Sequence, residues 1–366
     1  MATIHDIALT LTPGIGCGTA RQVIDLCGSA EALFAMSHSQ LAELFGSHTD
    51  IIDNIERRTA MPRAEQEMVF ITQHGIRPLF FTDADFPQRL NSPETADCPA
   101  LLYVLGNADL NAERTVSMVG TRRSTQYGRD NCGILVEQLL PLAPTIVSGL
   151  AYGIDTASHA AAVERGLPTV AVLGHGLDRI YPQANRRLAE RIVHEGGALV
   201  TEFPSGTAIN PGNFPARNRI IAALGDAIVV VEASEKGGAL ITAALAGSYH
   251  RDVFAVPGRL SDTASRGTNN LIATNKALLL RNADDIAYQL GWPLPGKEAR
   301  QQDLFPVLSP DEQAIVDLFH KNPTLTLDEL VVLTGHSLAK VAGLVFNLEM
   351  QKTLRALPGR LYELAR

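Results

Sequence analysis

Short apolar runs alternate with helical stretches between residues 80 and 290, and this alternation limits the possible fold more than any other feature of the chain. The runs are continuously apolar, which is typical of parallel strands buried on both faces. Strands that alternate with helices predict βαβ units, so we expect an α/β domain with one parallel sheet between two helical layers. The predicted strands are residues 115–119, 145–148, 169–173, 198–201, 227–231 and 253–256, and the predicted helices are residues 131–140, 155–165, 186–194, 214–224 and 239–250.

Four of the predicted strands run into a loop that carries glycine just before the next helix. The carboxyl ends of parallel strands meet at one edge of the sheet, where the ligands of such folds bind. Glycine lets backbone amides approach a phosphate, and a helix N-terminus favours the negative charge. The sequence therefore predicts a phosphate-binding edge. Its candidate residues are Gly120, Thr121, Arg122, Ser148, Gly149, Gly153, Lys236 and Gly238.

The segment 210–219, NPGNFPARNR, adds aromatic, amide and basic side chains beside the same edge. Proteins hold single strands by stacking unpaired bases on aromatic rings while cations contact the phosphates. Phe214, Arg217, Asn218 and Arg219 are therefore candidate contacts for single-stranded DNA. Burial of Phe214 in the core is an equal alternative. An ion pair to Glu202 or Asp226 is the alternative for the two arginines.

The local charge favours an acidic ligand for this region. Residues 114–219 contain 11 arginines and 8 acidic residues, a net charge of +3. The whole chain carries −8, so the remainder carries −11. A basic region on an acidic protein is typical of a single nucleic-acid site rather than indiscriminate binding.

Motifs of nucleotide-dependent enzymes are absent. No GxGxxG follows the first predicted strand, and no GxxxxGK[ST] occurs anywhere, which disfavours nicotinamide enzymes and ATPases. Asp155 and His159 lie one helical turn apart, but a structural role explains them better than catalysis. Ser148 is not part of a GxSxG motif. We expect a binding protein that has no catalytic residues and is not an enzyme.

The two ends of the chain have a different character from the middle. Residues 1–75 predict a helical domain of the helix-hairpin-helix or SAM-like kind, because LTPGIG at residues 11–16 joins two short helices, and a packing domain without a ligand is an equal alternative. Residues 76–290 form the α/β domain, and residues 291–305 read as a linker. Residues 306–366 predict a winged helix, with capping boxes at 309–312 and 326–329, a third helix at about 337–351 and a hairpin around Pro358-Gly359.

The composition points to the cytoplasm. The four cysteines, Cys17, Cys27, Cys98 and Cys132, form no CxxC pair, so neither a zinc site nor a disulfide framework is indicated. The first residues do not resemble a signal peptide, and no apolar stretch is long enough for a bilayer. We expect a cytoplasmic protein with no cofactor, no metal and no membrane contact.

Six motifs of the middle region carry a resemblance to a known family. They are VGTR at 119–122, SGLAYGID at 148–155, LGHGLDRIYPQANRRL at 173–188, NFPARNRIIAAL at 213–224, VVEASEKGGALITAALA at 230–246 and FAVPG at 254–258. Together they resemble the DNA-processing protein A family, also called Smf. The predicted helical head and winged-helix tail are similar to the accessory domains of that family.

The resemblance implies an extended Rossmann-like fold that binds and protects single-stranded DNA, acts as a homodimer and helps to load the RecA recombinase during natural transformation. It places the family's phosphate-binding arginine at Arg122. It places a second basic position at Arg186 or Arg187. Apolar residues at 268–272 and 277–280 lie near a sheet edge with little chain left to cover it, which favours dimerisation there.

Two other readings remain as alternatives. Rossmann-type nucleotide phosphoribohydrolases resemble this domain, but their PGGxGT loop is followed by a glutamate, whereas Ala243 to Ala246 supply no acid. A winged-helix transcription regulator is the other alternative. The predicted third helix offers only Lys340 and Asn347 for DNA, and residues 306–366 carry 6 basic against 7 acidic residues.

Overall fold

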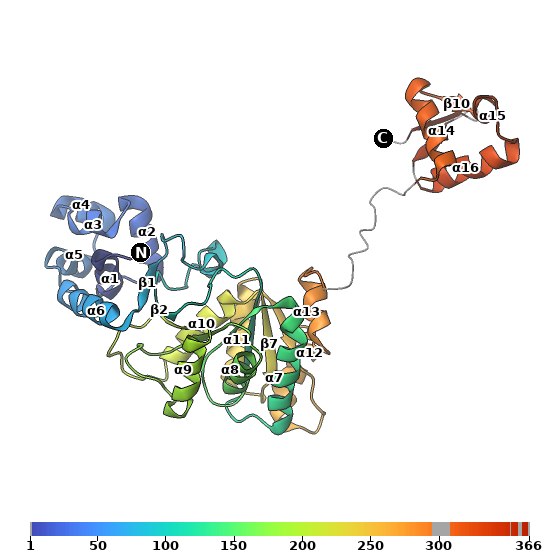
Figure 1. Ribbon diagram of the computed structural model, residues 1–366. Coiled ribbons are helices and arrows are strands. Elements are labelled where there is room, and N and C mark those ends of the chain that lie inside the picture. Colours follow the sequence, from blue (N-terminus) through green and yellow to red (C-terminus); the bar gives the residue numbers. More distant parts are fainter. Residues whose placement is uncertain (1, 295–307, 352, 358–360, 365–366) are drawn as a thin grey trace. The chain divides into compact units, whose positions relative to one another are not determined.

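The computed structural model describes residues 2–294, 308–351, 353–357 and 361–364 (Figure 1). The chain divides into two compact units, Met1–Gly296 and Lys297–Arg366. The first unit contains a bundle of short helices and a large sheet, and the second contains the winged-helix tail.

Short amphipathic helices make up the start of the first unit. A capping box formed by Thr3 and Asp6 begins the first helix, and the turn to the second contains Gly14 at φ +89°. The apolar faces of these helices share one core with the first two strands of the sheet. The helical character predicted for this region is confirmed. The helices are α1 (Ile4–Leu11), α2 (Cys17–Cys27), α3 (Ala30–Phe34), α4 (His38–Phe45), α5 (Thr49–Glu56) and α6 (Met61–His74).

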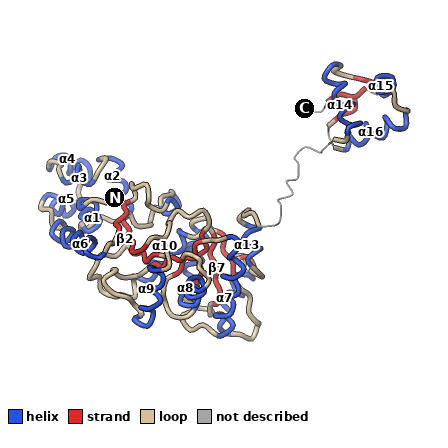
Figure 2. The backbone as a smooth tube through the Cα atoms, in the orientation of Figure 1, coloured by secondary structure: helices blue, strands red, loops and turns tan. Residues whose placement is uncertain are grey.

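One nine-stranded sheet runs through the rest of this unit, with the order β1-β2-β6-β5-β4-β3-β7-β8-β9 (Figure 2). The pairs β1–β2 and β2–β6 are antiparallel, and all the others are parallel. The strands are β1 (Arg77–Phe80), β2 (Leu101–Gly106), β3 (Thr115–Gly120), β4 (Thr145–Ser148), β5 (Thr169–Val172), β6 (Ala198–Thr201), β7 (Ala227–Glu232), β8 (Asp252–Ala255) and β9 (Leu278–Leu279).

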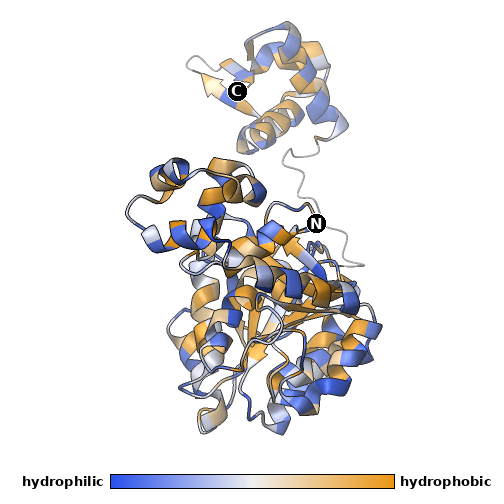
Figure 3. Ribbon diagram, turned by 90° about the vertical axis from the view of Figure 1, so that its left-hand side faces the viewer, coloured by the Kyte–Doolittle hydropathy of each residue, from blue (hydrophilic) through white to orange (hydrophobic). Residues whose placement is uncertain are grey.

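Helices cover both faces of the sheet, and the apolar strands lie between them (Figure 3). On β3, Met118 packs toward α7 and α8, whereas Val119 packs toward α10 and α11. Helices α9 and α13 share the α7 and α8 face, and α12 shares the other. The helices are α7 (Gln126–Leu139), α8 (Ile154–Glu164), α9 (Arg186–His194), α10 (Asn213–Leu224), α11 (Gly238–Ser248), α12 (Arg266–Ala273) and α13 (Ala283–Gln289). Single 3-10 turns are η1 (Gln88–Leu90), η2 (Pro93–Thr95), η3 (Leu140–Leu142), η4 (Gln183–Asn185) and η5 (Thr263–Ser265).

The predicted α/β architecture is confirmed. All six predicted strands and all five predicted helices of the middle region occur, with ends that differ by a few residues. Helix α7 begins earlier than predicted because Thr125 caps it, accepting a hydrogen bond from the Gly128 amide. Strands β1, β2 and β9 and helices α12 and α13 were not predicted. Strands β1 and β2 form the antiparallel side of the sheet, which the βαβ pattern does not encode.

The tail has the predicted winged-helix order. Both predicted capping boxes are present, Ser309 with Glu312 and Thr326 with Glu329, and Gly335 ends the second helix in the left-handed conformation. Residues 295–307 and the turn residues Pro358 and Gly359 lie outside the described residues, so most of the predicted linker does too. The elements are α14 (Pro310–Lys321), β10 (Leu325–Thr326), α15 (Leu327–Thr334), α16 (Leu338–Met350), β11 (Leu354–Leu357) and β12 (Leu361–Leu364), and the strands pair in the order β10-β12-β11.

Within the described residues, no single helix is both long and apolar enough to cross a membrane. The bent pair α15 and α16 meets the length and composition criteria when its two helices are taken together. The part of the chain that the structure describes contains no cluster of three or more His, Cys, Asp or Glu side chains suited to a metal ion.

Candidate nucleic-acid interface

A cleft of about 660 Å³ opens at the carboxyl ends of the central strands. The chain winds from β3 through β4 and β5 to β6 in one direction, and then continues on the other side of β3 with β7. The loops after β3 and β7 therefore diverge at a topological switch point, where ligands of open α/β sheets bind. Eight of the predicted contact residues line the cleft. They are Gly120, Thr121, Arg122, Phe214, Arg217, Asn218, Lys236 and Gly238.

The loop after β3 is held by Glu232, the last residue of β7. Its buried carboxylate accepts hydrogen bonds from the Thr125 amide at 2.8 Å and the Thr125 hydroxyl at 2.6 Å. The Glu232 carbonyl accepts a further bond from the Thr121 amide at 2.7 Å. Both ends of the segment that carries Arg122 are thus fixed to the neighbouring strand. The sequence analysis did not identify Glu232, although an acid at the end of an apolar strand is itself a signal of a buried polar role.

The loops after β3 and β4 are in direct contact through glycine. At Gly153, φ is +80°, and a Cβ atom would lie 2.2 Å from the carbonyl oxygen of Thr121. The next amide, that of Ile154, donates to the same Thr121 oxygen at 3.2 Å. Gly153 is therefore required for the close approach of two loops, which is a packing role.

Arg122 is an exposed cation of the cleft. Its guanidinium carbon lies 5.1 Å from the centre of the Phe214 ring, within cation–π range. Within the described residues, no ion pair or hydrogen bond occupies this guanidinium. The Tyr181 ring lies 6.1 Å from Phe214, and about half of Tyr181 is exposed. A free cation beside two accessible rings matches the way single strands are held, by phosphate contact and base stacking.

Arg217 is a buried cation beneath the cleft. Its Nη1 donates to the carbonyl oxygen of Val172 at 2.7 Å, and its guanidinium occupies the space that a side chain at Gly149 would need. Burial raises the pKa of the nearby Asp155 carboxyl above its ordinary value, and the charge of Arg217 opposes that shift. Burial lowers the pKa of Arg217 to about 10, so this side chain stays positively charged at neutral pH. Gly149 therefore makes room for a buried arginine.

His159 offers no proton-transfer chemistry to the cleft. Its ring is fully buried, and Nδ1 lies 2.8 Å from the Thr169 hydroxyl. Burial and the charge of Arg217 lower the pKa of His159 to about 3, so the ring is neutral at physiological pH. A buried neutral histidine held by a neighbouring strand is a structural residue.

Comparison with known proteins settles the family. A sequence model described as DNA recombination-mediator protein A matches residues 77–291, and one described as the DprA winged helix domain matches residues 298–360. The chain belongs to the DNA recombination-mediator protein A (DprA) family. The resemblance found in the sequence motifs is thereby confirmed, as is the winged-helix tail.

Relatives of this DprA-family chain match over most of their length. Protein Smf from Synechocystis sp. is 34% identical over 331 residues, which cover 80% of this chain and 82% of the relative. The putative DNA processing protein DprA from Mycobacterium tuberculosis is 32% identical and covers 94% of this chain and 90% of its own length.

Two solved DprA structures share the fold. DprA from Streptococcus pneumoniae superposes with a TM-score of 0.66 at 31% identity, covering 79% of this chain and 98% of that chain. DprA from Helicobacter pylori, whose structure is described in terms of its single-stranded DNA binding mode, gives 0.53 at 29% identity, covering 59% and 95%.

Ser148 and Arg219 of this DprA-family chain, like the buried Arg217, have partners inside the protein. Ser148 is fully buried, and its hydroxyl donates to the Met118 carbonyl oxygen at 2.6 Å. Arg219 forms an ion pair with Glu202, which is one of the two alternatives that the sequence offered. The other, Asp226, pairs with Arg89 at 2.7 Å. Both Ser148 and Arg219 are committed to the fold, and we leave them out of the interface.

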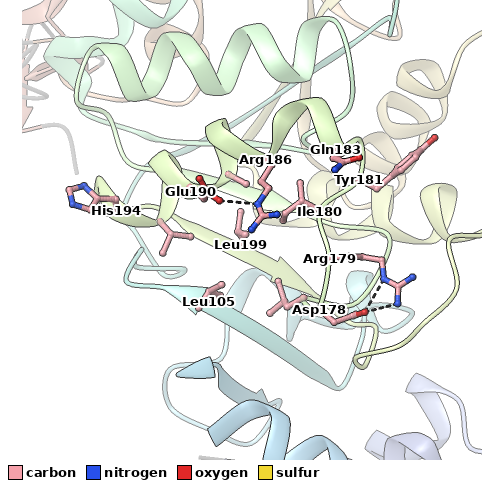
Figure 4. A pocket seen from close by; sticks show the side chains of 13 residues that line it. Leu105, Asp178, Arg179, Ile180, Tyr181, Gln183, Arg186, Glu190, His194 and Leu199 are labelled. Carbon is pink, nitrogen blue, oxygen red and sulfur yellow. Dashed lines mark hydrogen bonds and ion pairs between the residues drawn. The ribbon is translucent and has the colours of Figure 1, made fainter. Parts of the chain in front are cut away.

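Arg186 and Arg187 are exposed at the start of α9. Arg186 lies in a second pocket of about 790 Å³, where it pairs with Glu190 at 3.0 Å (Figure 4). The floor of this pocket is apolar, and Arg179 on its rim pairs with Asp178 at 2.6 Å. Arg186 and Arg179 therefore each have an acidic partner beside them, whereas no ion pair of Arg187 occurs among the described residues. Tyr181 lines both this pocket and the cleft.

Proposed function

We propose that this chain binds single-stranded DNA in the cleft at the carboxyl ends of β3, β4 and β7. The observation that carries the proposal is the exposed, unpaired Arg122 guanidinium 5.1 Å from the Phe214 ring. Arg122 contacts a phosphate, and Phe214 with Tyr181 stacks unpaired bases. Lys236, which follows β7 and also lines the cleft, is a second exposed cation for the backbone. The H. pylori relative, which is described as binding single-stranded DNA, supports the same ligand.

Duplex DNA fits this cleft less well. The walls are loops together with residues of α10 and α11, and neither helix stands free to enter a major groove, which is read by a helix or a two-stranded ribbon that presents basic and amide groups. Stacking requires bases that are free of their partners. We expect little sequence preference, because stacking accepts any base.

The wider role follows from the family. We infer first that the bound strand is protected and handed to the RecA recombinase during natural transformation. We infer second that the protein acts without catalysis in the cytoplasm. We infer third that residues 1–75, 76–290 and 306–366 act as three domains. RecA filament assembly on strands already coated with single-strand-binding protein, with and without this chain, tests the first of these. A rate of assembly that this chain leaves unchanged would contradict it.

We also propose a homodimer that forms through the β9 edge of the sheet. Leu278 and Leu279 form this edge strand, and about 45% of each is exposed. An uncovered apolar edge strand is a ready site for pairing. Sedimentation that shows only monomer at micromolar concentration would contradict the dimer.

The direct test of the proposed function is the Arg122→Ala variant. Losing a phosphate contact is expected to cost roughly 1–3 kcal/mol of single-strand affinity and to lower the salt slope by about one. Affinity for one oligonucleotide is measured against salt concentration. Arg191→Ala is the matched control, because Arg191 pairs with Glu195 on the surface of α9 away from the cleft. An unchanged affinity and slope for Arg122→Ala would remove Arg122 from the site.

A further inference from the structure

Glu67 belongs to α6, yet its carboxylate is used by a loop of the α/β region. Only 1% of Glu67 is exposed. The carboxylate accepts from the Ser205 amide at 3.0 Å and from the Ser205 hydroxyl at 2.6 Å. It also pairs with Arg63 at 2.8 Å, and Arg63 donates to the Ser205 carbonyl oxygen. Arg63 and Glu67, which lie one turn apart on α6, therefore bind the amide, the hydroxyl and the carbonyl oxygen of Ser205.

The same loop is held from its other side by the segment after β5. The Gly206 amide donates to Asp178 at 3.0 Å. At Gly176, a Cβ atom would lie 2.5 Å from the Pro204 carbonyl oxygen, so the two segments are in close contact there. Residues 203–207, which we call the anchored loop, are therefore bonded to the helical bundle on one side and to the segment after β5 on the other.

The anchored loop leads directly to the cleft. Residues 208–212 are all exposed, and their hydrogen bonds in the described structure are made within the segment 204–213. Ile209 and Pro211 of this segment line the cleft, and Phe214 follows in the first turn of α10. An exposed segment without outside bonds takes its position from its two ends. One of those ends is the anchored loop.

We propose that Glu67 is a positioning residue for the cleft: by fixing Ser205, it sets where Ile209, Pro211 and Phe214 stand beside Arg122. The helical bundle then contributes to DNA binding without touching DNA. The proposal rests on the proposed single-strand function. In this proposal Glu67 acts through the residues that stack on DNA bases, and the contacts to phosphate stay unchanged.

The test compares Glu67→Ala with Glu65→Ala, an exposed position on the same helix, in the full chain. The probe is a single strand that contains 2-aminopurine, whose fluorescence falls when the base stacks. We expect Glu67→Ala to bind roughly tenfold more weakly with an unchanged salt slope, because the phosphate contacts persist. At saturating protein the quenching is expected to be smaller than for the parent chain. Glu67→Gln, which keeps an acceptor for Ser205, is expected to restore most of the affinity.

A double-mutant cycle with Phe214→Ala gives the decisive result, because residues that act together are not additive. We expect Glu67→Ala to add little to the loss that Phe214→Ala already causes. A full additional loss in that background would overturn the proposal, and so would an affinity of Glu67→Ala within twofold of the parent chain. If Glu67→Ala does not fold, Ser205→Ala is the second variant, because it removes the hydroxyl bonds to Glu67 and Arg63 and keeps the amide bond to Glu67. We then expect a two- to threefold loss of affinity that vanishes in the Phe214→Ala background. A loss that persists there overturns the proposal.

The Arg122→Ala variant separates this inference from the proposed function. Binding that is insensitive to both Arg122→Ala and Phe214→Ala overturns the proposed function itself. Binding that is sensitive to these two and insensitive to Glu67→Ala and Ser205→Ala overturns only the role of Glu67.

Discussion

The cleft region and the winged-helix tail of this chain differ in the kind of side chain that they bury. Beneath the cleft, buried Asp155, His159 and Arg217 lie among the strands and helices, and Glu232 is buried beside them. In the described part of the tail, the buried side chains are apolar except for Glu312, which caps α14. Buried polar groups cost free energy unless they are paired, so their concentration at one place marks a site kept for more than stability.

The exposed surfaces of the cleft region and of the tail also differ. The cleft exposes an unpaired arginine beside aromatic rings, whereas the exposed side of α16 carries large apolar residues, with Phe346 61% and Met350 70% exposed. Lys340 on α16 is paired with Asp311 at 2.7 Å. A recognition helix needs free basic and amide groups on its outer side. The free Arg122 and the paired Lys340 favour the cleft over the tail as the place of the proposed DNA binding.

The largest expected effect is on the stability of the cleft region. Arg217→Met removes the buried donor to the Val172 carbonyl oxygen and the positive charge that opposes the raised pKa of the Asp155 carboxyl, which is expected to cost roughly 1–3 kcal/mol of unfolding free energy at neutral pH. Denaturant unfolding of the first unit measures the loss. Arg191→Met, which removes an exposed pair with Glu195, is the control and is expected to cost less than about 1 kcal/mol.

The pH dependence of that loss identifies its cause. Burial raises the folded-state pKa of Asp155, so the protonated form favours folding, and this contribution is lost as the pH rises through the raised pKa. Removing Arg217 raises the pKa of Asp155 further. The deficit of Arg217→Met is therefore expected to be greatest at neutral pH and to shrink as the medium is acidified. A loss of stability that stays constant on acidification would mean that the loss does not come from the Asp155 carboxyl.

A smaller effect is expected when the support of the Arg122 loop is removed. Glu232→Ala deletes the acceptor for the Thr125 amide and hydroxyl, and single-strand affinity is expected to fall about fivefold, close to 1 kcal/mol. Glu312→Ala removes a buried capping carboxylate of the tail and is the matched control. It is expected to reduce the stability of the tail by about 0.5–2 kcal/mol while affinity stays unchanged. Equal affinity losses in the two variants would contradict the contrast between the regions.

The smallest effect is expected from removing the tail. A chain that ends at Gly296, the last residue of the first compact unit, is expected to hold an oligonucleotide within about threefold of the full chain at one salt concentration. The reason is that the paired Lys340 and the apolar side of α16 contribute little phosphate contact. An affinity loss of more than tenfold, about 1.4 kcal/mol, would place the tail within the DNA site.

The sequence predicted those parts of the structure that depend on neighbouring residues. Apolar runs predicted the parallel strands, and the capping boxes predicted where two tail helices begin. Glycines after strands marked the edge of the sheet where the cleft opens, although Gly149 and Gly153 make room for protein atoms there. Arg122 and Phe214 were both selected as contacts, and the structure brings them together.

The features that the sequence did not predict depend on contacts between residues far apart in the chain. Glu232 meets Thr125 across 107 positions, and Glu67 meets Ser205 across 138, so no local pattern could reveal either pair. Ser148 and Arg219 were selected by residue type, but neighbouring segments supply partners for both. Composition identifies which residues could bind phosphate, and only the tertiary structure determines which of them are free to do so.

A preference of the cleft for unpaired strands is the central prediction for this chain. Competition between a single-stranded oligonucleotide and a blunt duplex of the same sequence, at one salt concentration, measures this preference with the full chain. Because base stacking requires unpaired bases, we predict that the single strand binds at least about tenfold more tightly, a difference of about 1.4 kcal/mol or more. Equal affinity for the two would contradict the assignment of the cleft as a single-strand site.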